Sequence, residues 1–143
     1  EDSRFMQLAI DEAKQGDYPF GAVIVREGKV AARGFNSSKR NADPTAHGEM
    51  VAIRTFLNMH EPSDFKGTTL YTSGEPCVMC MGAIIWCGIA RVVYAASIEQ
   101  LATRIGQIDI PAKQIADATS FANIDLTGGV LASEAMVLFP EKL

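Results

Sequence analysis

The chain has few residues of the kinds that stabilise secreted, fibrous or membrane-spanning proteins. It has only three cysteines and two histidines in 143 residues, and so few cysteines, in an odd number, argue against a disulfide framework. No uncharged stretch is longer than residues 76–90, which is too short to cross a bilayer. Internal repeats and low-complexity tracts are absent from the sequence. We therefore expect a reduced, cytoplasmic protein without a membrane segment.

Positive charge is also in short supply. Lys and Arg number 13 against 17 Asp and Glu, for a net charge of −4, which argues against binding nucleic acid by bulk electrostatics. Hydrophobic residues make up 48% and charged residues 21% of the chain, a composition that excludes disorder and is typical of a globular domain. We expect residues 1–143 to form a single domain and expect no nucleic acid partner.

The hydrophobic pattern alternates between helical and extended segments. Apolar residues recur at helical spacing in residues 3–15, 46 to about 59, 75 to about 87, and 130–138. Apolar runs predict strands at residues 21–26, 29–34, 68–72 and 91–96, of which the first two are joined by a tight hairpin. Residues 100–123 show no clean period. This order predicts a three-layer α/β fold, with a mixed sheet covered by helices.

Two cysteines and one histidine have the chemistry and spacing of a metal site. Cys77 and Cys80 form a Cys-x-x-Cys pair thirty positions after His47. One imidazole and two thiolates suit a tetrahedral zinc ion whose fourth position is open to water, and zinc lowers the pKa of such a water to about 7. We expect the cysteines in the first turn of a helix opened by Pro76, and His47 at the start of another helix.

Two glutamates flank these ligands. Glu49 follows His47 by two positions, so it can approach the metal-bound water without binding the metal, and can pass a proton to a ring nitrogen and to the leaving group. Its alternative role is that of an ordinary carboxylate at a helix start. Glu75 either caps a helix or tunes the zinc ligands from outside. A structural zinc site normally has four protein ligands, and a catalytically silent zinc scaffold remains an alternative.

The spacing resembles a known signature. His47-Gly48-Glu49 and the Pro76–Cys80 segment are similar to the H-x-E and P-C-x-x-C motifs of the zinc-dependent cytidine and deoxycytidylate deaminase superfamily, and the likeness extends from about residue 19 to residue 131. The resemblance implies a cytidine-deaminase-like fold with a mixed five-stranded sheet, one Zn²⁺ per chain and a homodimer. It also implies hydrolytic deamination, in which zinc hydroxide attacks an amine-bearing ring carbon and ammonia leaves.

The same resemblance suggests substrate-binding residues. In this interpretation Asn36 binds the base by a hydrogen bond, Phe20 and Trp86 lie against it, Ala46 lines the site, and Asp109 receives the outer N–H edge of a purine. The alternatives are a turn residue for Asn36, core positions for Phe20 and Trp86, and an ordinary loop aspartate for Asp109.

Different segments of the sequence resemble two branches of the superfamily that differ in substrate. Residues 18–23, 70–77 and 82–86 resemble bacterial guanine deaminases, whereas residues 91–94 and 126–134 resemble tRNA-wobble adenosine deaminases. Residues 131–143 contain Glu134, Glu141 and Lys142, and lack both the basic terminal helix of the tRNA enzymes and the longer aromatic tail of the guanine enzymes. We expect a small base or nucleoside as substrate, a guanine-like purine first. The alternatives are tRNA adenosine and cytosine, isocytosine or a triazine.

Overall fold

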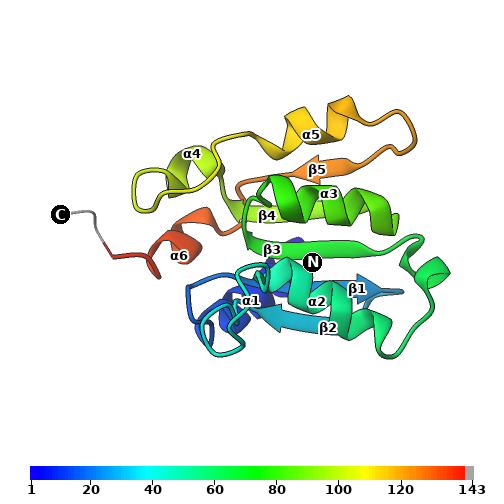
Figure 1. Cartoon of the computed structure of the whole chain (residues 1–143), viewed down its shortest axis with the longest axis horizontal. Helices are drawn as coiled ribbons and strands as arrows, with labels where there is room; N and C mark the ends of the chain where they lie inside the picture. The colour runs from blue at the N-terminus through cyan, green and yellow to red at the C-terminus, as the bar shows by residue number, and fades with distance from the viewer. Residues whose placement is uncertain (141–143) are drawn as a thin grey trace.

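The computed structural model describes residues 1–140 (Figure 1). Residues 141–143, on which part of the terminal charge argument rests, lie outside this range. No helix of the described part is long and apolar enough to cross a membrane. The elements are α1 (Asp2–Ala13), β1 (Gly21–Arg26), β2 (Lys29–Phe35), α2 (Gly48–Leu57), η1 (Pro62–Phe65), β3 (Thr69–Gly74), α3 (Val78–Cys87), β4 (Arg91–Ala96), α4 (Ile98–Leu101), α5 (Ala112–Ala118), β5 (Asp125–Thr127) and α6 (Ala132–Met136).

The strands form one mixed sheet in the order β2-β1-β3-β4-β5. β1 pairs antiparallel with β2 and with β3, while β3, β4 and β5 are parallel. The five-stranded mixed sheet is therefore confirmed. β5 has only three residues, too few to display the alternation by which a strand is recognised in sequence.

Helices cover both faces of the sheet, which confirms the three-layer prediction. One core cluster includes Phe56 of α2, Ile84 of α3 and Val92 of β4. The other includes Ile10 of α1 and Val93 of β4. Figure 1 shows α2, α3 and α5 in front of the strands and α1 behind them. Neighbouring residues of β4 thus face opposite layers, as the pleat of a strand requires.

Gly34 allows the start of α2 to lie against the sheet. A Cβ atom at Gly34 would lie 2.4 Å from the backbone nitrogen of Ala52 and 2.5 Å from the carbonyl oxygen of Gly48. Only a residue without a side chain leaves room for this approach. The close contact fixes the first turn of α2, and with it His47, relative to the end of β2.

The predicted closing helix is shorter than expected. α6 spans five residues, and its N-cap Leu131 has a positive φ of 57°, so the helix cannot extend back to residue 130. Phe139 instead packs in the core cluster of α1, which explains why the apolar pattern continues beyond the helix.

Candidate metal centre and active site

The site lies at the carboxyl ends of β2 and β3. Asn36 directly follows β2, and Cys77 follows the last residue of β3 by three positions. These two strands run in the same direction because each is antiparallel to β1. Loops leaving one edge of a sheet commonly form the binding site in α/β folds.

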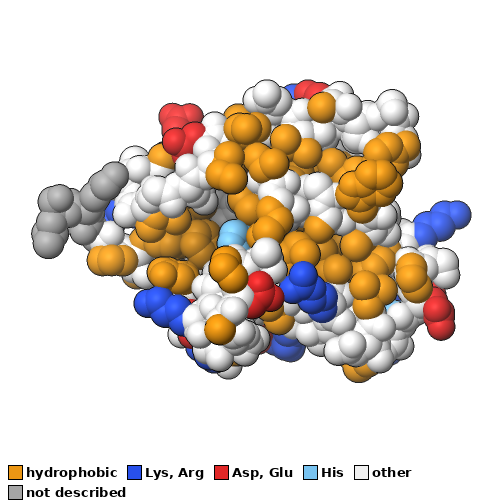
Figure 2. Space-filling model, in the orientation of Figure 1, with side chains coloured by type: hydrophobic (Ala, Val, Ile, Leu, Met, Phe, Trp, Pro, Cys, Tyr) orange, Lys and Arg blue, Asp and Glu red, His pale blue; other side chains and the backbone are white. Residues whose placement is uncertain are grey.

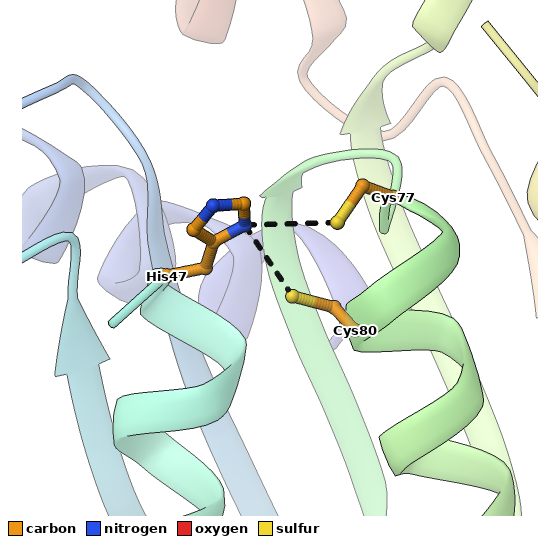
Figure 3. A group of neighbouring side chains, drawn as sticks. All are labelled: His47, Cys77 and Cys80. Carbon is orange, nitrogen blue, oxygen red and sulfur yellow. Dashed lines mark hydrogen bonds between the residues drawn. The ribbon is translucent and has the colours of Figure 1, made fainter. Parts of the chain in front are cut away.

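His47, Cys77 and Cys80 converge as a metal-binding triangle (Figure 3). The Sγ atoms of Cys77 and Cys80 each lie 3.6 Å from Nδ1 of His47. Tetrahedral zinc, with a Zn–N bond of about 2.1 Å and Zn–S bonds of about 2.3 Å, requires an N-to-S separation of about 3.6 Å. The three side chains therefore fit a zinc ion, which Nδ1 and the two Sγ atoms would hold.

Two of the ligands precede their helices instead of starting them. His47 is the N-cap of α2, with φ −69° and ψ 157°, and Cys77 is the N-cap of α3, with φ −70° and ψ 173°. The expectation that Cys77 lies inside the first turn of a helix opened by Pro76 was wrong, because the helix begins at Val78. Neither N-cap side chain makes a capping hydrogen bond to its helix, and each is turned toward the other ligands.

The three ligands lie beside a cavity. In residues 1–140, no further His, Cys, Asp or Glu joins the three ligands closely enough to complete the set. A cavity of about 740 Å³ is bordered by His47, Cys77 and Glu49. Glu49 is only 5% exposed, so its carboxyl group lies beside the ligands and is shielded from bulk water.

The electrostatics of the site suit a cation. A hydrogen bond from the Cys80 thiol lowers the pKa of Cys77 to about 4, and the His47 ring adds to this effect. The same contact with Cys77, together with burial, raises the pKa of Cys80. The hydrogen bond to Cys77 also raises the pKa of His47, and burial raises the pKa of Glu49 to about 7. Negative charge thus gathers at the Cys77 sulfur, where a metal ion would neutralise it.

The model of the cytidine and deoxycytidylate deaminase zinc-binding region matches residues 1–96, which include His47, Glu49, Cys77 and Cys80. The chain belongs to this family. Its zinc chemistry and its fold are accordingly those of a zinc-binding deaminase domain, as the motif predicted.

Named relatives and a solved structure extend this result. The chain is 42% identical over 104 residues to a tRNA-specific adenosine deaminase of Buchnera aphidicola, covering 70% of this chain and 64% of the relative. It is 47% identical over 78 residues to the guanine deaminase of Bacillus subtilis, covering 54% and 50%. A structure from studies of A-to-I editing by tRNA:A34 deaminases superposes with a TM-score of 0.79 and 31% identity, covering 96% of this chain and 99% of that one.

The chain therefore spans less than two thirds of the length of either named relative. Because one relative is named for tRNA, the comparisons do not support the expectation that nucleic acid is not a partner. Deamination of tRNA, named in two of these matches, was expected from the sequence only as an alternative.

Two of the expected substrate residues border the cavity of this deaminase-family chain. Asn36 is buried, and its Oδ1 accepts hydrogen bonds from the backbone N–H and the hydroxyl of Ser38 at 3.1 and 2.7 Å, which leaves the amide nitrogen to donate to a ligand. Phe20 lies beside it, with its ring 5.2 Å from that of Phe139 in an edge-to-face pair. The two rings give the cavity an aromatic wall.

The other three substrate residues do not line the cavity. Ala46 is buried, and its backbone holds the loop: its N–H donates to Asp43 and its carbonyl accepts from Ser37. Trp86 is 79% exposed on α3, whereas its neighbour Ile85 is buried. Asp109 is exposed. In its loop, only residues 105–108 border the cavity. A contact of these three residues with the substrate stays a prediction, because none of them borders the cavity.

One wall of the cavity was not predicted from the sequence. Residues 105–108 and Phe139 border the cavity, but residues 100–123 have no period from which to place them. Glu75, 8% exposed, also borders the cavity. It connects this wall to the loop that carries Cys77. Its Oε1 accepts the N–H of Ile98 at 2.9 Å and its Oε2 that of Ala112 at 2.7 Å.

Proposed function

We propose that this chain catalyses the hydrolytic deamination of a small amino-substituted heterocyclic base or nucleoside, with guanine-like purines first. The observation that carries the proposal is the position of Glu49, buried in the same cavity as His47 and Cys77. A carboxyl group there can accept a proton and return it to a ring held above the metal ligands. Zinc bound by the triangle supplies Lewis-acid activation of water.

The cavity walls support a flat, largely uncharged substrate. Phe20 and Phe139 offer aromatic surface for a ring, and aromatic side chains favour stacked or edge-to-face contact with other rings. The Asn36 amide nitrogen is placed to hold one acceptor of the base. These groups orient a ring so that an amine-bearing carbon can face the zinc ligands and Glu49.

The charges at the cavity loop favour a small molecule over RNA. Arg40 pairs with Asp17, with both side-chain and backbone nitrogens donating to that carboxylate. The ammonium group of Lys39 lies over the ring of Tyr18, 4.9 Å from its centroid. Cations already engaged in this way contribute less to phosphate binding than a basic surface patch.

Deamination of tRNA adenosine is the second candidate, favoured by the names of two of the similar proteins. An ammonia-release assay on the zinc-loaded protein separates the possibilities. Its panel is guanine, guanosine, cytosine, isocytosine, cytidine, adenosine and triazines, with inosine formation in a tRNA anticodon stem-loop measured in parallel. Turnover of guanine or guanosine without inosine formation supports the first candidate, and the reverse supports the second. No turnover by the wild type on either set supports a silent zinc scaffold.

We also propose that the chain forms a homodimer through the outer face of α3. Hydrophobic side chains gather over α3 and its neighbouring helices (Figure 2), and exposed Trp86 packs on exposed Phe121 with ring centroids 4.8 Å apart. Exposed apolar surface of this kind marks an interface. Light scattering on a sizing column should show a dimer that Trp86→Glu dissociates. Val137→Glu, at another exposed apolar residue, should leave it intact, whereas a monomeric wild type contradicts the proposal.

A further inference from the structure

Gln107 is one of the residues that border the cavity beside the zinc ligands. Its Nε2 atom is buried and has no hydrogen-bond partner within residues 1–140. A buried donor left without an acceptor is costly, so native structures usually provide it with one. Because Gln107 belongs to the lining of the cavity, a rotation of its amide group can bring this donor to an acceptor bound there.

The segment that carries Gln107 is fixed at both ends. It connects α4 to α5, and the two oxygens of Glu75 bind the backbone N–H groups of Ile98 and Ala112, the first residues of those helices. Glu75 itself stands two positions before Cys77. One buried carboxylate therefore holds this segment against the loop that carries Cys77. This contact fixes the position of Gln107 relative to the metal ligands.

The surroundings of Gln107 give this donor a defined task. Its neighbours Ile105 and Ile108 are apolar and border the same cavity, as does Phe139. On the other side, the Asn36 amide nitrogen is also left to donate. An apolar cavity with a donor on each of two walls is complementary to a ring that has acceptors on two edges.

We propose that Gln107 determines substrate specificity by donating a hydrogen bond from Nε2 to a carbonyl oxygen of the substrate ring. The inference rests on the proposed function and narrows it to oxo-substituted, amine-bearing rings, of which a 6-oxopurine is one. A site built to bond a substrate group rejects the analogue that lacks the group, because its own polar atom is then left unpaired. Gln107 is thus the residue by which the cavity distinguishes such a ring from an analogue without the oxygen.

Binding of guanine and of 2-aminopurine tests the assignment, since both carry the 2-amine and only guanine has the carbonyl. Binding is measured on zinc-loaded protein with Glu49→Gln, so that the ligands are not consumed. Gln107→Met, of similar size, should weaken guanine binding roughly 5- to 100-fold and change 2-aminopurine binding little. Gln107→Glu, which replaces the donor by an acceptor, should weaken guanine binding at least as much. Gln114→Met, at an exposed glutamine of α5, is the control and should change neither.

Each other outcome has a separate meaning. Equal weakening of both ligands by Gln107→Met would show that the side chain only packs in the wall, and unchanged guanine binding would show that it makes no contact; either overturns the assignment while the proposed function stands. If the protein without the Gln107 substitution binds neither purine and the wild type releases no ammonia from any base or nucleoside of the panel, both proposals fail together. Zinc content and far-UV circular dichroism confirm that each variant is folded.

Discussion

Replacing Glu75 by glutamine should loosen the cavity wall without removing any zinc ligand. In the wild type, Oε1 and Oε2 each accept one backbone N–H, from Ile98 and from Ala112. The amide of a glutamine offers one oxygen. Its NH₂ group would therefore face one of the two N–H groups, donor against donor, in a position that is almost fully buried.

The size of the effect follows from these two contacts. A hydrogen bond to a charged group contributes about 1.5–3 kcal/mol, and an unpaired buried donor costs about 1–3 kcal/mol. Glu75→Gln retains one bond and loses the other, so the free energy of unfolding should fall by about 2–4 kcal/mol. In a domain of this length, about 3 kcal/mol lowers the midpoint of thermal unfolding by roughly 10 °C.

Urea unfolding and amide hydrogen exchange measure the change. The amides of Ile98 and Ala112 should exchange faster in Glu75→Gln, while amides in the centre of the sheet keep most of their protection. Glu99→Gln is the matched control, because Glu99 is an exposed glutamate of α4; its unfolding free energy should stay within about 0.5 kcal/mol of wild type. If Glu75→Gln unfolds at the wild-type urea concentration with both amides still protected, Glu75 does not hold the wall.

Three further outcomes follow from the structure. Glu49→Gln should keep the zinc content but lower kcat by roughly 10²–10⁴-fold, and near-normal turnover with bound zinc would rule out its role as proton carrier. Gly34→Ala should destabilise by about 3 kcal/mol or more, because its Cβ would lie 2.4 Å from the nitrogen of Ala52; a wild-type denaturation midpoint would contradict this. The bidentate Arg91 hydrogen bonds lower the pKa of Asp2, so the pair stabilises the fold above about pH 4 and loses that effect as pH falls through the lowered pKa. Asp2→Asn should therefore lower the free energy of unfolding by no more than about 1 kcal/mol near neutral pH. The difference from wild type should shrink in acid, and a difference that grew there would refute the reasoning.

The zinc ligands were predictable from sequence because their chemistry is carried by rare residue types at fixed spacing. Three cysteines and two histidines leave few ways to build a site, and the Cys77 and Cys80 spacing fits one ion. The prediction was wrong about the local backbone. Whether a residue is an N-cap or lies one position inside a helix depends on its dihedral angles, and helix boundaries read from sequence are uncertain by a residue or two.

The strands were predictable where local chemistry specifies them. The hairpin between β1 and β2 turns at Glu27 and Gly28, both with positive φ, of 52° and 77°, the backbone of a tight turn whose twist matches the paired strands. β5 carried no such signal. It is held by pairing with β4, a contact between segments far apart in the chain.

The cavity wall could not be predicted for the same reason. The helices α4 and α5 have four and seven residues, too short to be stable by their own propensity, and the first amide of each is held by Glu75. The loop between them has no period, so nothing local distinguishes Gln107, at the cavity, from Asp109, which does not reach it. α3 is apolar on more than one side, so its sequence alone does not show which side Trp86 faces.

A helix that begins beside a metal ligand cannot tilt without displacing that ligand. α2 and α3 both begin one residue after a ligand, and Ile53 and Ile84, each more than one turn farther along, lie in the core cluster beneath them. Truncating either isoleucine should therefore weaken zinc affinity as well as lower the unfolding free energy. Sequence drift in this hydrophobic layer is then limited by the coordination geometry of an ion that these residues never touch.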